Sequence, residues 1–154
     1  VGHHGLVGKQ NMFEHSLRAP LIVVGPNIPA GKRFHTPVYI QDIMATSLEL
    51  AGVQADHVEF KSLLPVVRGE TDTLHDVIYG AYLDKQRAVI RDGWKLVYYP
   101  AVPKCLLFNL NDDPDEMHDL SADPKCAEKL AELKKLLIEQ EEKMDGPLAG
   151  KITF

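Results

Sequence analysis

The chain has 154 residues, a formal net charge of -5 and a pI near 5.8. That length suits one ordinary domain or a little more, with enough residues to bury a hydrophobic core. The acidic balance argues against nucleic acid as a general partner, because phosphate binding normally needs a basic face, and no stretch reaches the apolar length of a membrane span. Cys105 and Cys126 lack metal-ligand spacing and are expected to be free, partly buried thiols.

The chain begins with a glycine-rich stretch, GHHGLVGKQ (residues 2–10), that carries two imidazoles and one ammonium. Such a loop lets its backbone approach a ligand closely while His3, His4 and Lys9 deliver positive charge, which suits an anion. The alternative is a glycine-rich turn leading into a strand, with both histidines merely solvated. Val1 follows no initiator methionine, charged n-region or apolar h-region, so we interpret the start as a cut through a longer protein.

A short helical turn is predicted over residues 11–16, and Pro20 ends it because proline biases its predecessor toward extended backbone. The next four residues form a continuous apolar run that stops at a Gly-Pro pair; they are Leu21, Ile22, Val23 and Val24. A run of this length predicts a strand buried on both faces of an α/β sheet.

Residues 41–51 are expected to form an amphipathic helix. Ile43, Met44 and Leu48 recur at helical spacing with Leu50, and Gly52 supplies the left-handed residue that commonly ends a helix. The stretch 54–73 shows neither helical nor strand period. We therefore predict an irregular loop there, in which residues 62–65 pack a short turn onto the core.

The second half of the chain changes period and predicts an antiparallel sheet. Its short runs are rich in β-branched and aromatic residues and cover 77–82, 87–91, 94–99 and 106–110. Asp92-Gly93 joins two of them and is a strong hairpin signal, because a type I′ turn needs positive φ at both central residues. About four strands follow, which is a usual size for a small sheet.

A final helix is predicted to begin at Asp123-Pro124, in the preferred order of N-cap followed by proline. Its apolar stripe consists of Cys126, Leu130, Leu133 and Leu137, widened by Ala127 and Leu136. The stripe is expected to cover one face of the sheet. A coiled coil is the alternative, but fewer than three clean heptads favour core packing. Gly146-Pro147 is expected to end this helix.

The polar stretch 111–119 invites comparison with a calcium loop. It lacks the glycine at the sixth position and the terminal glutamate of an EF-hand, so a turn that ends the preceding strand is favoured. His118 beside it is not enough for a metal site.

Several colinear blocks together resemble the type I sulfatases of the alkaline-phosphatase-like superfamily. The first is G-x-H-G-x-x-G-K-Q followed by FEHSLRAPLI (residues 13–22), which resembles the segment after the Asp-His-Gly or Asp-Asn-Gly metal motif of that family. The others are DIMATSLELAGV (42–53), SLLP (62–65) and LFNLNDDPDE (107–116). The family usually has proline where Ala45 stands. The resemblance covers nearly the whole chain but only the C-terminal part of the family.

The resemblance implies the end of an α/β catalytic domain over residues 1–73 and an antiparallel sheet-plus-helix subdomain over 74–154. In the family, a formylglycine made within C/S-x-P-x-R is the nucleophile and a divalent ion, usually calcium, binds the sulfuryl oxygens. Neither Cys105 nor Cys126 stands in that motif, and no serine supplies it. Formylglycine and the acidic metal ligands are therefore expected outside this chain, with no metal ligand within it, and the chain alone is expected to be inactive.

The resemblance also implies site residues. Lys9 stands where family members carry the lysine that contacts the sulfate, and the alternative is a solvated surface lysine. His4 matches a frequent family histidine that either binds substrate or stiffens the loop. His3 occupies a variable position and is expected on the substrate side or in solvent. Three further residues are expected to be structural, with Arg18 pairing a buried carboxylate; they are Glu14, His15 and Arg18.

The expected function is the C-terminal part of a sulfatase acting on sulfate esters, with a sulfated small molecule or glycan as substrate. Alternatives are a phosphonate monoester or phosphodiester hydrolase of the same superfamily, and a non-catalytic interaction domain. Exported, periplasmic or lysosomal locations are typical of the family, but no signal here fixes one. The chain alone is expected to self-associate through residues 21–24, whose neighbouring strands would lie elsewhere in the enzyme.

Overall fold

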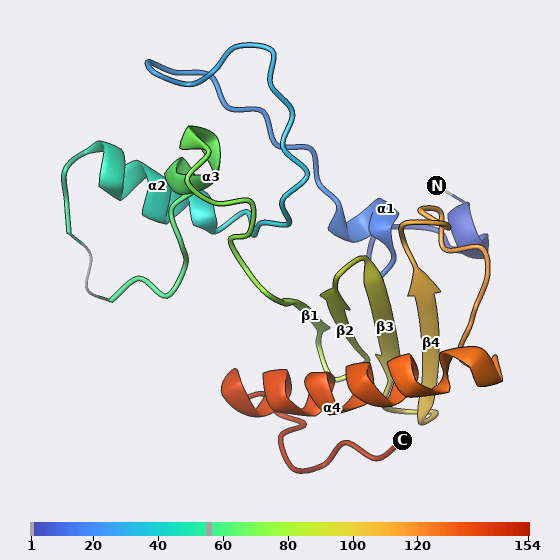
Figure 1. The fold of residues 1–154 in the computed structure, drawn as a ribbon. Coiled ribbons are helices and arrows are strands. Elements are labelled where there is room, and N and C mark those ends of the chain that lie inside the picture. Colours follow the sequence, from blue (N-terminus) through green and yellow to red (C-terminus); the bar gives the residue numbers. More distant parts are fainter. Residues whose placement is uncertain (1, 55–56) are drawn as a thin grey trace. The chain divides into compact units, whose positions relative to one another are not determined.

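The computed structural model describes residues 2–54 and 57–154 (Figure 1). Contacts group the chain into two compact units, one made of the residues up to Ala19 together with Tyr79–Phe154, and the other of Pro20–Ile78. The first unit is therefore built from both ends of the sequence. The predicted division at residue 74 concerns the domains of a longer enzyme and stays a prediction.

The first unit contains a four-stranded sheet. Its strands are β1 (Ile78–Tyr82), β2 (Gln86–Arg91), β3 (Trp94–Tyr99) and β4 (Lys104–Asn109). They lie in the order β1-β2-β3-β4, and β2-β3 and β3-β4 pair antiparallel. The four predicted strands are thus confirmed.

The turn between β2 and β3 has the backbone that its sequence predicts. Asp92 and Gly93 both have positive φ, 53° and 76°, and join the pair Arg91↔Trp94. A side chain at Gly93 would also meet the side chain of Asn111 at 2.3 Å. Glycine therefore suits the backbone conformation there, and a larger residue would also displace the Asn111 side chain.

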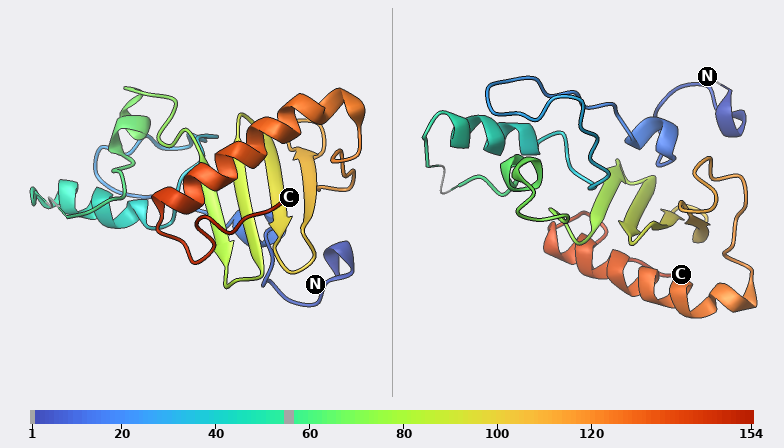
Figure 2. Two further views of the ribbon diagram at one scale, coloured as in Figure 1. Left: turned by 90° about the horizontal axis from the view of Figure 1, so that it is seen from below. Right: turned by 45° about the horizontal axis from the view of Figure 1, so that its top comes forward.

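The helix α4 (Ala127–Lys143) lies across one face of this sheet, as Figure 2 shows in both views. The helix starts after a 3-10 turn, Pro124–Cys126. The Asp123 carboxylate caps this turn by accepting a hydrogen bond from the Lys125 N–H at 2.9 Å. Its buried residues are Leu133, Leu136, Leu137 and Glu141. The predicted helix and its role as a cover for the sheet are confirmed, and core packing takes the place of the coiled-coil alternative.

A buried ion pair fastens α4 to the sheet, and the apolar stripe did not reveal it. The Arg87 guanidinium donates to the Glu141 carboxylate at 2.7 Å, and the Tyr79 hydroxyl donates to the same group. The Leu148 N–H donates to it at 2.9 Å, which holds the residues after the helix. Arg87 and Glu141 are 1% and 0% exposed, so each charge depends on the other.

The opposite face of the sheet is covered by the segment near the start of the chain. Met12 and Phe13 form a buried cluster with Ala88, Val97 and Phe108. Alternation along the strands places this cluster on one face and the α4 contacts on the other. The sheet is therefore buried on both faces, and residues 11–17 supply the second cover.

The second unit is built around α2 (Asp42–Leu50) and α3 (Leu64–Arg68). The helix predicted over 41–51 is confirmed, but the residues it buries are Asp42 and Thr46. Two residues of the predicted apolar face, Met44 and Leu50, are 51% and 64% exposed. The Asp42 carboxylate accepts hydrogen bonds from the backbone N–H groups of Tyr39 and Lys61 and contacts the ring of His75. Asp42 is buried because these bonds outweigh the cost of removing its charge from water.

Two local predictions in this unit are wrong. Residues 64–68, expected in an irregular loop, form α3, because Pro65 suits the first turn of a helix and Gly69, with φ of 75°, ends it. Residues 55–56 of the predicted loop lie outside the described residues. Residues 21–24 form no strand, since a strand requires a hydrogen-bonded neighbour and the described residues offer none; Ile22 and Val24 are 85% and 91% exposed.

Cys105 and Cys126 are free and partly buried, as expected, and burial raises the pKa of the Cys105 thiol. Among the helices described, none combines the length and the apolar character that crossing a membrane requires.

Candidate functional site

The glycine-rich stretch forms a compact loop at the start of the first unit. His3–Gly5 make a 3-10 turn, closed by hydrogen bonds from the Gly2 N–H to the Leu6 carbonyl and from the Leu6 N–H to the His3 carbonyl, at 2.9 and 3.0 Å. Gly2 and Gly5 have φ of 87° and 70°, and nothing lies within 4 Å of where a side chain would start. Glycine is needed there for backbone conformation and not for space.

The loop brings the two predicted histidines together and adds a third. The rings of His3 and His4 lie 4.6 Å apart between centroids, and His15 lies 5.3 Å from His3 and 5.9 Å from His4. His4 stacks on Phe13 at 4.0 Å with an angle of 12° between the rings. Because Phe13 belongs to the buried cluster on the sheet, the position of His4 is set by the hydrophobic core.

Asn11 fixes how His15 presents its ring. The Asn11 side-chain oxygen accepts from the Phe13 N–H at 3.0 Å, so its amide nitrogen is the atom that faces His15 Nε2, at 3.2 Å. An amide nitrogen only donates, so Nε2 is the accepting, unprotonated nitrogen. Burial, followed by the positive charge of His3 and His4, lowers the pKa of His15, in agreement with a neutral ring.

Lys9 lies in the same loop, three residues before Met12 enters the core, and its side chain is exposed. Within the described residues no ion pair and no side-chain hydrogen bond of Lys9 is found. The structure therefore places the histidines together and leaves Lys9 available to a ligand. The roles predicted for Lys9, His4 and His3 stay predictions.

A buried charge cluster anchors the segment that follows the loop, and the sequence did not reveal it. Lys95, on β3, is 0% exposed and its ammonium lies 2.9 Å from Glu14 and 2.7 Å from Glu116. Glu14 opens α1 (Glu14–Leu17), and its N–H donates to the Glu116 carboxylate at 2.6 Å. Glu14 is structural, as expected. Arg18 is exposed and pairs with no carboxylate among the described residues, so its ion pair stays a prediction; the buried cation of this cluster is Lys95.

The described residues do not fit the calcium ion of the resembled family. Calcium takes several oxygen ligands, whereas the loop offers imidazoles and an ammonium. In the 111–119 stretch, the Asp113 carboxylate accepts the N–H groups of Met117 and His118 at 3.0 and 2.7 Å. Despite some desolvation, these bonds and the nearby His118 lower the pKa of Asp113. The stretch is a turn that ends β4, as predicted.

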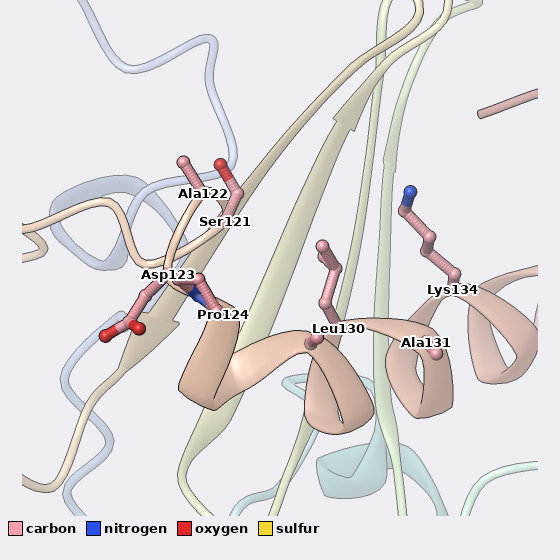
Figure 3. A pocket seen from close by; sticks show the side chains of 8 residues that line it. Ser121, Ala122, Asp123, Pro124, Leu130, Ala131 and Lys134 are labelled. Atoms are coloured by element: carbon pink, nitrogen blue, oxygen red, sulfur yellow. The ribbon is translucent and has the colours of Figure 1, made fainter.

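A hollow lies beside the start of α4, away from the loop histidines and Lys9 in sequence. It has a volume of about 250 Å³ and is lined mainly by small and apolar groups, among them Ala122, Pro124 and Leu130 (Figure 3). The carboxylate at its rim belongs to Asp123, which is engaged as the cap of the helix. The volume is below the usual range of small-molecule sites, so we place no function there.

An antiparallel sheet covered by a C-terminal helix is also found in solved sulfatase structures; a putative sulfatase from Bacteroides thetaiotaomicron superposes with a TM-score of 0.63 at 24% identity, covering 71% of this chain and 25% of that chain. Over residues 2–143 the sequence matches the family described as N-sulphoglucosamine sulphohydrolase, C-terminal, and the chain belongs to this family. The predicted family and fold class are thus confirmed.

Two curated relatives are close in sequence. The chain is 36% identical over 132 residues to a choline-sulfatase of Rhizobium meliloti, covering 81% of this chain and 25% of the relative. It is 33% identical over 128 residues to a sulfatase of Formosa agariphila, covering 80% and 22%. The chain thus spans about a quarter of the length of these relatives.

Solved structures show the same relationship. A 2-O GAG sulfatase superposes with a TM-score of 0.58 at 27% identity, covering 66% of this chain and 24% of that chain. The phosphonate monoester hydrolase of Agrobacterium radiobacter superposes with a TM-score of 0.54 at 20% identity, covering 66% and 24%. The second similarity shows the fold alone.

Proposed function

We propose that this chain is the C-terminal part of a sulfatase in which Lys9 and His4 contact the sulfate ester. The observation that supports the proposal is the membership of residues 2–143 in a sulphohydrolase C-terminal family, together with a folded loop whose exposed ammonium has no ion-pair partner among the described residues. His3, exposed beside His4, lines the substrate side of the same loop.

Lys9 contributes charge stabilisation. An ammonium is a compact point charge on a flexible stem, suited to a tetrahedral oxyanion and to a leaving oxygen that gains negative charge as the ester bond breaks. The Lys95 cluster and the Phe13 core hold the chain on the C-terminal side of Lys9. They limit where its backbone lies before substrate arrives, which reduces the ordering needed on binding.

Formylglycine and calcium belong to other parts of the proposed enzyme. When bound there, they would supply the nucleophile and the charge that neutralises the sulfuryl oxygens. The described residues fit neither group, so the role of this chain is limited to binding and to stabilising charge through the loop.

We propose a sulfated carbohydrate as the substrate class. A structural neighbour at 23% identity was solved in complex with its substrate, D-glucosamine-2-N,6-O-disulfate, and the 2-O GAG sulfatase also acts on a glycan. Choline-sulfatase among the relatives keeps a sulfated small molecule open. The second candidate is phosphonate monoester hydrolysis, because a phosphonate monoester hydrolase shares this fold and the fold alone does not separate the two activities.

The test is Lys9→Ala in the full-length enzyme. We expect kcat/KM on a sulfate ester to fall by about a hundredfold or more, as for loss of one charge-stabilising donor. Lys32→Ala, which removes another exposed lysine, is the matched control and should stay close to wild type. A folded Lys9→Ala enzyme with wild-type activity removes Lys9 from the site.

Two observations separate the alternatives. Parallel rates on matched sulfate and phosphonate esters decide between the two hydrolases. The coding sequence upstream of Val1 decides between an enzyme and an interaction domain: C/S-x-P-x-R with paired aspartates supports the enzyme, and its absence contradicts it.

A further inference from the structure

Three histidines from two parts of the chain converge on one side of the loop. His3, His4 and His15 each offer one ring nitrogen, and these three nitrogens lie within 4.8 Å of one another. His3 and His4 come from the 3-10 turn, and His15 comes from α1. The convergence depends on the fold, because eleven positions of sequence separate His4 from His15.

The spacing suits a tetrahedral transition metal after a small adjustment. Zn²⁺ binds imidazole nitrogen at about 2.0–2.1 Å, so ligand nitrogens in a tetrahedral site lie about 3.3–3.4 Å apart. His3 is exposed, and His15 is exposed and held by one hydrogen bond from Asn11, so both rings can adjust once that bond is replaced, whereas His4 is held on Phe13. One fixed ligand and two adjustable ones close the remaining distance.

The chemistry of the three rings also favours a metal. The Nε2 atom of His4 is buried and finds no hydrogen-bond partner in the part of the chain that the structure describes. The Nε2 atom of His15 accepts a hydrogen bond from the Asn11 amide, so this nitrogen carries the lone pair that a metal would use. A metal must displace this one contact, at the cost of a single neutral hydrogen bond.

We infer that His3, His4 and His15 form a binding site for a divalent transition metal of the Zn²⁺ class, with a fourth position open to water or ligand. Imidazole ligands favour Zn²⁺ and its neighbours in the transition series over Ca²⁺ and Mg²⁺, which prefer oxygen. The site therefore differs from the calcium site expected elsewhere in the enzyme. The competing explanation is ring packing alone, with no affinity for metal.

One consequence rests on the proposed function. His4 cannot ligate a metal and contact a sulfate ester through the same nitrogen, so metal and substrate should exclude each other. Zn²⁺ should then inhibit the full-length sulfatase competitively, and His15→Ala, which removes a ligand outside the proposed substrate contacts, should relieve that inhibition.

Binding is tested without any activity. Co²⁺ is the spectroscopic probe, because tetrahedral Co²⁺ absorbs strongly in the visible range, and Zn²⁺ is titrated by calorimetry. Cu²⁺ and Ni²⁺ are avoided, since a free amino terminus with histidine at the third position binds them by itself. For the same reason, the titration is repeated on a chain extended before Val1.

The variants are His3→Ala and His15→Ala, with His118→Ala as the matched control, because His118 is an exposed histidine beside Asp113 that does not belong to the three-histidine group. We expect each loop variant to weaken Zn²⁺ binding by about tenfold or more, and the control to leave it unchanged. Circular dichroism confirms that each variant is folded.

Wild-type chain that binds neither probe overturns the inference. So does binding that survives His15→Ala or that is lost equally with His118→Ala. A full-length protein could bind Zn²⁺, lose this binding in the loop variants but not in the control, and still lack sulfatase activity. That result would support the metal site and contradict the proposed function, so the two proposals can be refuted separately.

Discussion

Lys95→Met should expose how much the loop depends on one buried cation. Methionine has a similar length and no charge, so the substitution keeps most of the packing and removes the partner of Glu14 and Glu116. The Glu116 side chain is 1% exposed and cannot reach water in the folded state. The mutation therefore leaves a buried carboxylate without a cation, which is among the costlier changes in a protein interior.

The loss in the free energy of unfolding caused by Lys95→Met has an upper bound that depends on pH. A stranded carboxylate can take up a proton, and protonating a glutamate with the ordinary pKa of about 4.3 costs about 3.7 kcal/mol at pH 7 and about 1 kcal/mol at pH 5. Removing one partner of a buried pair typically costs about 3–5 kcal/mol. We therefore expect Lys95→Met to lower the free energy of unfolding by about 3 kcal/mol at pH 7, within this bound, and by no more than about 1 kcal/mol at pH 5.

The assay is urea unfolding at both pH values, followed by fluorescence of Trp94, the one tryptophan of the sequence and the neighbour of Lys95 on β3. Far-UV circular dichroism serves as the second probe. Lys95→Met/Glu116→Gln is the control, because glutamine keeps an acceptor for the Glu14 N–H and removes the stranded charge. It should recover at least about 1 kcal/mol at pH 7.

A loss below about 1 kcal/mol at pH 7 would contradict the buried ion cluster. A loss of the same size at both pH values would contradict the explanation by charge, because only the ionised carboxylate is sensitive to acid. No recovery in the double variant would assign the loss to packing around Lys95.

Three further outcomes follow. Asp42→Ala removes the acceptor of two backbone N–H groups, so α2 should lose hydrogen-exchange protection, at a cost on the order of 3 kcal/mol, while the sheet stays protected. Although burial opposes ionisation, the neighbouring guanidinium and phenol lower the pKa of Glu141 below its usual 4.5. Its stabilisation is thus present above pH 4.5 and lost as pH falls through the lowered pKa, so thermal unfolding of Glu141→Gln should depend less on acid pH. Ile22→Lys/Val24→Lys should reduce self-association in light scattering at micromolar concentration, and Val102→Lys, which adds charge at another exposed apolar residue, should not.

The second half of the fold was predictable because its signals are local. The hairpin follows from Asp92-Gly93, and the helix cover follows from a stripe that ends in Leu137. The strand predicted for residues 21–24 was wrong because its signal is not local. An apolar run predicts burial, but what buries it is a neighbouring strand, and a single segment of sequence does not contain that neighbour.

The buried polar residues were beyond the reach of periodicity. Asp42, Lys95 and Glu141 are charged, so a pattern of apolar residues assigns them to the surface. Each is buried because a distant residue satisfies it: Lys95 pairs with Glu14 across 81 positions and Glu141 with Arg87 across 54.

The placement of these ion pairs explains how a C-terminal sheet can serve a loop at the start of the chain. Alternation along β3 puts Lys95 on the face that carries Phe13, and Arg87 reaches α4 from the other face. The sheet thus fastens the helix with one buried pair and the loop with the other. Since His4 stacks on Phe13 and Glu14 binds Lys95, a change in this face of the sheet is transmitted to the histidines through two contacts. The sheet therefore acts as the rigid support of the loop that carries the proposed site.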